Sequence, residues 1–198
     1  MNKLVIITGV SGTGKTTLAN VLYEKIKNSI LLSYDKLSEN IYDMVGFRDK
    51  FQKKQLQLLN ERIYKELINQ CMKRKDSIII LEKPFRREWK EFLERLSRKY
   101  EYEVYTINMF SKNFETIWKR LKKREMSKKD RHPSHYLDSY YFKNREGYLP
   151  FFEYDYDKFK EEYDKLLVNS INLGNVINVE DIDRLDVNKL IAKLLNKK

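Results

Sequence analysis

The chain has 198 residues, of which 41% are hydrophobic and 13% aromatic, which is enough for one domain with a single core and excludes a chain that is disordered throughout. One cysteine, Cys71, and two histidines, His132 and His135, exclude a disulfide scaffold and an ordinary structural zinc site. The net charge of +11 favours phosphate-rich ligands. However, the excess of lysine, 28 residues against 12 arginines, is also what an AT-rich coding sequence produces without any functional demand. Charge alone therefore makes binding to nucleic acid possible but does not favour it.

The chain opens with a pattern typical of a buried strand, a glycine loop and a packed helix. Residues 4–8, LVIIT, form a β-branched run without alternation, which predicts a strand covered on both faces. Over residues 16–27 the apolar side chains recur at helical spacing, at Leu18, Val21, Leu22 and Ile26. Residues 29–33 predict a second buried strand, and a polar stretch follows it.

The rest of the chain alternates between predicted helices and strands. A long helix is expected before the third strand, and its predicted buried stripe is Leu56, Leu59, Ile63, Leu67 and Cys71. Strands three to five are predicted at residues 77–81, 104–110 and 176–179. Apolar residues at helical spacing mark the other helices, in residues 89–96, 114–121 and 187–195.

This alternation implies parallel strands joined by right-handed crossovers, and hence a three-layer α/β domain. We expect one domain over residues 1–198. Residues 126–156 break the alternation, because they are polar and aromatic, contain Pro133 and Pro150 and show no clean period. We therefore expect an inserted region there.

The loop after the first strand carries the strongest motif of the chain. Residues 9–16, GVSGTGKT, match G-x-x-x-x-G-K-[ST] and stand between a predicted strand and a predicted helix, as this phosphate-binding loop requires. Its glycines let backbone N–H groups converge on phosphate oxygens at a helix N-terminus. Lys15 is predicted to bridge the β- and γ-phosphates, Thr16 to ligate Mg²⁺ and Thr17 to contact the α-phosphate. The predicted nucleotide-binding residues are Gly9, Ser11, Gly12, Thr13, Gly14, Lys15, Thr16 and Thr17.

The loop, in a chain of this size, resembles that of the small P-loop kinases, which include nucleotide, shikimate, gluconate, chloramphenicol and polynucleotide 5′-hydroxyl kinases. The resemblance covers most of the chain. It implies a P-loop NTPase fold with a five-stranded parallel sheet in the order 2-3-1-4-5 and a helical lid, here residues 126–156. It also implies that ATP and Mg²⁺ bind at the carboxyl ends of the strands, which is where ligands bind in open α/β sheets generally.

Asp35 follows the second strand closely and is a candidate catalytic base. In the kinases that this chain resembles, an acidic residue at this position binds the acceptor hydroxyl. A carboxylate placed there orients a hydroxyl for in-line attack on the γ-phosphate and accepts its proton. The alternative is a surface aspartate that caps the following helix, a role that Ser38 also suits.

Glu82 ends the third strand, where P-loop proteins keep a carboxylate that holds the water shell of Mg²⁺. Because Mg²⁺ keeps most of its waters, one direct hydroxyl from Thr16 and one outer carboxylate from Glu82 suffice. The alternative is that Glu82 pairs with the neighbouring cations Lys83, Arg86 or Arg87.

Arginines in the helix FETIWKRLKKRE are candidates for stabilising the transferred phosphoryl group. Arg120 and Arg124 lie one turn apart and adjoin its apolar face. Their spacing is similar to the R-x-x-x-R lid signature of the small P-loop kinases, and Arg131 is a plausible third lid arginine. Guanidinium groups stabilise charge that spreads over the γ-phosphoryl oxygens.

Residues 131–135, RHPSH, hold both histidines of the chain. They are compatible with a lid loop that contacts substrate or with an ordinary surface turn. A metal site formed by the two histidines is disfavoured because the sequence offers no third ligand. Many aromatic residues follow this segment. We expect them to form the packing of a helical insertion, and stacking on a base or sugar of a ligand is the alternative. Arg48 is a weak candidate for contacting an anionic or polyol acceptor.

The sequence thus predicts a cytoplasmic kinase that uses ATP and Mg²⁺ to phosphorylate a hydroxyl group of a small molecule, without membrane contact. No apolar run approaches the roughly 20 residues that cross a bilayer. Two alternatives stay open, a polynucleotide or tRNA-linked 5′-hydroxyl kinase and a nucleotide-dependent regulatory ATPase. The preference for ATP over GTP rests on the resemblance, and the acceptor and oligomeric state cannot be predicted.

Overall fold

A computed structural model describes residues 2–127, 132–135, 137–141, 155–168 and 170–195. The core is a five-stranded parallel sheet in the order β2-β3-β1-β4-β5, which confirms the predicted topology. Its strands are β1 (Lys3–Gly9), β2 (Ser29–Ser33), β3 (Ile78–Glu82), β4 (Glu103–Phe110) and β5 (Asn175–Glu180). Among the described residues, no helix is both long and apolar enough to cross a membrane.

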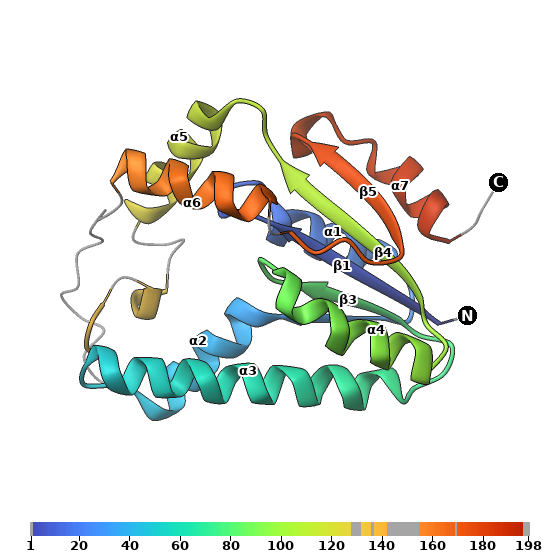
Figure 1. Cartoon of the computed structure of the whole chain (residues 1–198), viewed down its shortest axis with the longest axis horizontal. Helices are drawn as coiled ribbons and strands as arrows, with labels where there is room; N and C mark the ends of the chain where they lie inside the picture. The colour runs from blue at the N-terminus through green and yellow to red at the C-terminus, as the bar shows by residue number, and fades with distance from the viewer. Residues whose placement is uncertain (1, 128–131, 136, 142–154, 169, 196–198) are drawn as a thin grey trace.

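Helices cover both faces of the sheet, so the molecule has three layers (Figure 1). The α-helices are α1 (Lys15–Lys25), α2 (Tyr34–Val45), α3 (Lys50–Met72), α4 (Lys90–Lys99), α5 (Phe114–Glu125), α6 (Tyr156–Val168) and α7 (Val187–Leu194). Since side chains alternate along a strand, Leu4 and Ile6 pack toward α3 and α4, whereas Val5 and Ile7 pack toward α1 and α7. This two-sided burial explains why β1 and β3 are continuous apolar runs in the sequence.

The segment after β2 differs from the expected polar stretch. It is helix α2, which begins directly at Tyr34 and ends before Gly46, whose φ is 71°. Its apolar residues Leu37 and Ile41 are one turn apart and pack against α3, but the polar residues around them hide this short stripe in the sequence. The finding matters for function because it places Asp35 in the first turn of a helix.

The buried stripe of α3 also differs from the prediction. Leu56 is buried as expected, but Leu59 and Leu67 are 44% and 37% exposed. The stripe continues instead through residues spaced four apart, namely Asn60, Tyr64, Ile68 and Met72. Helix α3 carries apolar residues on two adjacent stripes, and the fully buried Tyr64, whose hydroxyl donates to the Leu32 carbonyl at 2.8 Å, fixes which stripe faces the sheet.

Two smaller apolar clusters lie beyond the sheet. Helices α5 and α6 pack around Ile117, Leu121, Phe159 and Tyr163, and α6 was not predicted. Near α2, Tyr140 is buried and pairs with Phe47 through an antiparallel bridge. The burial of Tyr140 favours packing over base stacking for this residue, whereas Tyr141 is 41% exposed. Most of the lid expected at residues 126–156 lies outside the described residues, so the lid and the single-domain boundary stay predictions.

Candidate active site

The phosphate-binding loop, residues 9–16, connects β1 to α1 as predicted. Gly9 has a φ of 142°, and a Cβ there would lie 2.1 Å from the Met109 carbonyl oxygen, so the turn requires glycine. Gly14 adopts the left-handed conformation at the N-cap of α1. The Lys15 ammonium is buried and donates to the Val10 carbonyl at 2.8 Å, and the Thr13 hydroxyl donates to the same carbonyl. The loop is thus preorganised for phosphate.

A pocket of about 370 Å³ opens beside this loop. Gly12, Gly14, Lys15, Thr16 and Thr17 line it. Of the other predicted binding residues, Ser11 lies in the loop between β1 and α1, half-buried, and Gly9 ends β1. Arg120, Arg124, Ile182 and Asp183 complete its lining. We call it the nucleotide pocket because the phosphate-binding loop forms one of its walls.

Two of the three predicted arginines, Arg120 and Arg124, line the nucleotide pocket. Arg120 contacts Asp181 at 3.1 Å and Asp183 at 2.5 Å, in the turn after β5. The Arg120 guanidinium lowers the pKa of the Asp181 carboxyl despite an opposing effect of burial. Arg124 lines the pocket one turn further along α5. Arg131 lies outside the described residues. Arg120 therefore ties α5 to the end of β5 and borders the nucleotide pocket at the same time.

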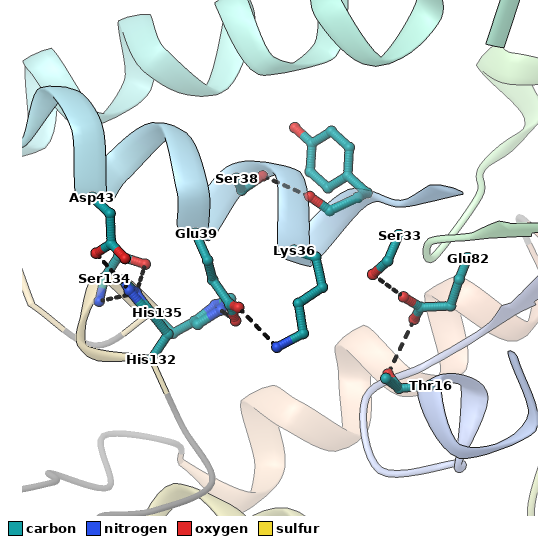
Figure 2. A network of polar contacts seen from close by, with 11 residues as sticks. Thr16, Ser33, Lys36, Ser38, Glu39, Asp43, Glu82, His132, Ser134 and His135 are labelled. Atoms are coloured by element: carbon teal, nitrogen blue, oxygen red, sulfur yellow. Dashed lines mark hydrogen bonds and ion pairs between the residues drawn. The ribbon is translucent and has the colours of Figure 1, made fainter. Parts of the chain in front are cut away.

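Glu82 connects the phosphate loop to β2 (Figure 2). Its carboxylate is 2% exposed and accepts hydrogen bonds from the hydroxyls of Thr16, at 3.3 Å, and of Ser33, at 2.7 Å. Its oxygens face these hydroxyls instead of Lys83, Arg86 or Arg87. Burial raises the pKa of the Glu82 carboxyl, while the Ser33 hydrogen bond and the Lys15 charge oppose this rise.

The Thr16 and Ser33 hydroxyls and the Glu82 carboxylate form a set of oxygen donors that suits Mg²⁺. Because Mg²⁺ keeps several waters, the set needs few direct protein ligands. Among the described residues, no three His, Cys, Asp or Glu side chains gather as an alternative metal site. The donor chemistry therefore fits Mg²⁺ that is bound mainly by phosphate and water.

Replacing Glu82 with glutamine is expected to separate stability from function. The pKa of Glu82 is raised by burial, so the ionised carboxylate destabilises the folded protein as pH rises through the usual glutamate range. Glu82→Gln should therefore unfold at a higher temperature than the wild type at pH 7, and the difference should shrink on acidification. Loss of an outer partner of the metal should lower Mg²⁺-dependent turnover by roughly 10- to 100-fold.

Thermal unfolding at pH 7 and pH 5, without nucleotide, together with a coupled ADP assay, measures both effects of Glu82→Gln. Ser97→Ala is a suitable control, because Ser97 is a buried hydroxyl of α4 that bonds only the Leu93 carbonyl among the described residues. A lower melting temperature of Glu82→Gln combined with wild-type turnover would contradict this account of the site.

Asp35 lies in the first turn of α2, two residues after the N-cap Ser33. Asp35 therefore does not cap this helix. Ser38 does not cap it either, since its hydroxyl donates to the Tyr34 carbonyl at 3.0 Å within the helix. The Asp35 side chain is exposed, but electrostatic repulsion from its negative charge raises the pKa of the Glu82 carboxyl. The carboxylate thus points to solvent close to the Thr16–Glu82–Ser33 network.

Two further pockets meet at Asp35. One, of about 400 Å³, lies between α2, α3 and the 3-10 turn η2 (Pro133–His135). The other, of about 460 Å³, lies between α3 and the turn that follows β3. Tyr34, Asp35 and Glu61 line both pockets, and we call the pair the acceptor pockets. Arg48, the weak acceptor candidate, is exposed and lines neither of them.

Lys83 lines the second acceptor pocket, whereas the sequence suggested it only as a possible ion-pair partner of Glu82. Its ammonium lies 3.5 Å from the centroid of the Tyr34 ring and 4.6 Å from that of the Trp89 ring. Burial lowers the pKa of Lys83 to about 8, and the carboxylates of Glu61 and Asp35 oppose this fall. Its position directly after the carboxyl end of β3 was the sequence signal that identifies it.

The histidine segment docks on α2 (Figure 2). His132 contacts the Asp43 carboxylate at 3.0 Å, and His135 contacts the Glu39 carboxylate at 3.0 Å. Burial opposes ionisation of Glu39, but the hydrogen bond from His135 and the charge of Lys36 lower the pKa of its carboxyl. Each histidine thus has its own carboxylate partner. The segment borders the first acceptor pocket through Ser134 and His135.

Comparison with known proteins places this arrangement among P-loop families. The model of the family AAA_33, described as "AAA domain", matches residues 4–141. A protein of Archaeoglobus fulgidus named "Probable adenylyl-sulfate kinase" is 30% identical over 110 residues. This match covers 53% of the chain and 66% of the relative, so it spans just under two thirds of the relative's length.

Solved structures share the fold. A "putative kinase" from Chloroflexus aurantiacus J-10-fl superposes with a TM-score of 0.72 at 19% identity, over 100% of this chain and 98% of that one. The tunicamycin resistance protein of Deinococcus radiodurans gives 0.57 at 11% identity, over 100% and 95% of the two chains. Kti12 of Chaetomium thermophilum gives 0.57 at 13% identity, over 98% of each chain. At these identities the likeness concerns the fold.

Proposed function

The chain belongs to the AAA_33 family of AAA domains, a P-loop kinase-like family, and on that premise we propose that it transfers the γ-phosphoryl group of ATP to a hydroxyl group of a small molecule. One observation carries the proposal. The Thr16–Glu82–Ser33 network joins the nucleotide pocket, which Thr16 lines, to the acceptor pockets, which Tyr34 and Asp35 line directly after Ser33. A donor and an acceptor bound in these pockets meet at one edge of the sheet.

In the proposed reaction, the acceptor hydroxyl binds at Asp35. Its oxygen attacks the γ-phosphorus, the bond from that phosphorus to the β,γ-bridging oxygen breaks, and ADP leaves. The hydroxyl proton passes to the Asp35 carboxylate, which the exposed position of this side chain allows. Lys15 and the arginines of α5 neutralise charge on the phosphates, so catalysis is mainly positioning and electrostatic stabilisation.

Mg²⁺ would be held through Thr16, with Glu82 and Ser33 orienting its water shell, and would neutralise charge on the phosphate oxygens. The sequence-based assignment of Lys15, Asp35, Arg120, Arg124 and Arg131 as catalytic residues is part of this proposal. We also propose that residues 1–198 form one kinase domain with a lid at residues 126–156.

Transfer of labelled γ-phosphate to pooled acceptors tests the proposal. Separate pools contain sugars and hydroxy acids, nucleosides and nucleotides including adenylyl sulfate, hydroxylated antibiotics, and 5′-hydroxyl RNA. We expect label in one small-molecule pool with Mg²⁺ and its loss without Mg²⁺. Label in the RNA pool alone would replace the proposal with a polynucleotide kinase. ATP hydrolysis without labelling of any pool would favour a regulatory ATPase.

A further inference from the structure

The second acceptor pocket brings three cations to the turn after β3. Lys65, Lys83 and Arg86 line it, together with the carboxylates of Asp35, Glu61 and Glu88. These charges are not equivalent. The Lys65 ammonium contacts the Glu61 carboxylate at 3.0 Å, so each neutralises the other, and Glu88 is on the exposed outer turn η1 (Arg87–Trp89).

The Lys83 ammonium has a different environment from that of Lys65. It lies against the faces of Tyr34 and Trp89, at 3.5 and 4.6 Å from the ring centroids, and within the described residues it makes no hydrogen bond or ion pair. Aromatic rings stabilise the position of a cation but accept none of its three N–H groups as a carboxylate or phosphate would. A half-buried ammonium with unused donors is a strong site for an anion.

Rigid neighbours hold this ammonium in place. Tyr34 packs edge-on against the buried Tyr64, and Trp89 packs edge-on against both Tyr64 and Phe85. The lysine follows Glu82 at the end of a central strand, and its backbone N–H is 3.4 Å from the Ile7 carbonyl. The cation is therefore fixed relative to Asp35, which lines the same pocket.

We infer that Lys83 binds an anionic group of the acceptor, so that the substrate is a hydroxylated anion whose hydroxyl lies at Asp35. The inference rests on the proposed function and narrows its acceptor to hydroxy acids, phosphate esters and sulfate esters, which share the oxyanion that an ammonium recognises. Arg86 lines the same pocket and is a second cation for a group that carries more than one charge. Lys83 is thus a specificity-determining residue.

Anion binding can be measured without catalysis, because Trp89 is next to Lys83. The chain has two tryptophans, so Trp118→Phe leaves Trp89 as the only tryptophan reporter. With the nucleotide pocket saturated by Mg²⁺ and a non-hydrolysable ATP analogue, sodium sulfate is titrated against chloride at constant ionic strength. We expect a saturable change in Trp89 fluorescence that Lys83→Met weakens by about 10- to 100-fold, the loss of one charge-assisted hydrogen bond.

Lys90→Met is the matched control, because it removes one exposed positive charge next to Trp89 without altering the residues that line the pocket. It should retain the sulfate response, and Lys83→Arg should restore most of it. Circular dichroism checks that each variant is folded. Absence of a saturable response, or an equal response in Lys83→Met, would overturn the inference.

Kinetics with matched acceptors separate this inference from the proposed function. Each hydroxy acid is paired with its amide, and each phosphate or sulfate ester with its parent alcohol. Lys83→Met should raise KM for the anionic member by about tenfold or more with little change in kcat, and the preferred ester or acid identifies the anion. Equal labelling of both members, unaffected by Lys83→Met, overturns the inference while the kinase stands. Failure to label any acceptor overturns the proposed function, and the sulfate titration still decides whether Lys83 binds anions.

Discussion

Lys15→Met is expected to lower kcat for phosphoryl transfer by roughly 10²- to 10³-fold, the usual effect of removing one preorganised donor from developing charge. The Lys15 ammonium is buried in the phosphate loop and borders the nucleotide pocket, so nucleotide phosphates would contact it directly. Methionine keeps most of the side-chain volume and removes the charge. Initial rates of ADP formation at saturating ATP, with and without acceptor, measure the loss.

Lys27→Met is the control for Lys15→Met, because Lys27 is exposed beyond the end of α1 and lines none of the three pockets. It should keep wild-type rates. If Lys15→Met retained activity within twofold of the wild type, the phosphate loop would not be the site of nucleotide chemistry.

Asp35→Asn is expected to lower transfer to the acceptor by about 10²- to 10⁴-fold, the usual contribution of a general base. Asparagine can still accept a hydrogen bond, so the acceptor should bind while its proton has no base. The fold should persist, since the carboxylate is exposed and its favourable position in the first turn of α2 contributes less than about 1 kcal/mol. The measurement is the initial rate of labelled product.

The same Asp35→Asn samples give a second readout, the rate of ATP hydrolysis in the absence of acceptor. We expect this rate to stay within twofold of the wild-type value, because Asp35 lines the acceptor pockets and not the nucleotide pocket. Glu24→Gln, an exposed acid on α1, is the control. Unchanged transfer by Asp35→Asn would remove Asp35 from the mechanism and favour a regulatory ATPase.

The centre of the sheet was predictable from local pattern because β1 and β3 are buried on both faces, whereas β2 is half-buried and β5 is largely exposed. Continuous apolar runs such as LVIIT and SIIIL are typical of strands that are covered on both faces in a layered domain. The phosphate-binding loop then shows that the site lies at the carboxyl end of β1. The family match and the strand order bear out the resemblance to small P-loop kinases.

The acceptor side was less predictable because it depends on contacts between segments distant in sequence. The position of Lys83 directly after β3 can be read from the sequence, but its packing against Tyr34 and Trp89 is evident only in the folded structure. The histidines read as a surface turn or a lid loop, whereas their partners Asp43 and Glu39 lie about 90 residues earlier on an unpredicted helix. Which apolar stripe of α3 faces the sheet likewise depends on the tertiary packing of Tyr64, and the periodicity of the sequence does not reveal it.

The fold also bears on the alternatives. The positive charge of the chain is compatible with nucleic acid, but among the described residues the acceptor pockets combine their cations with the carboxylates of Asp35, Glu61 and Glu88. Those carboxylates would repel a polynucleotide backbone, which is recognised by grooves lined with cations. A small hydroxylated anion, with one charged group at Lys83, fits this mixed lining better.

The partition of the γ-phosphoryl group between acceptor and water distinguishes a kinase from an ATPase in one experiment. Labelled ATP is turned over by the wild-type protein with Mg²⁺ and the best acceptor, and ADP, labelled product and free phosphate are quantified together. We expect one phosphoryl group on the acceptor for each ADP formed, with little free phosphate. ADP matched by free phosphate, with the acceptor unlabelled, would contradict this expectation.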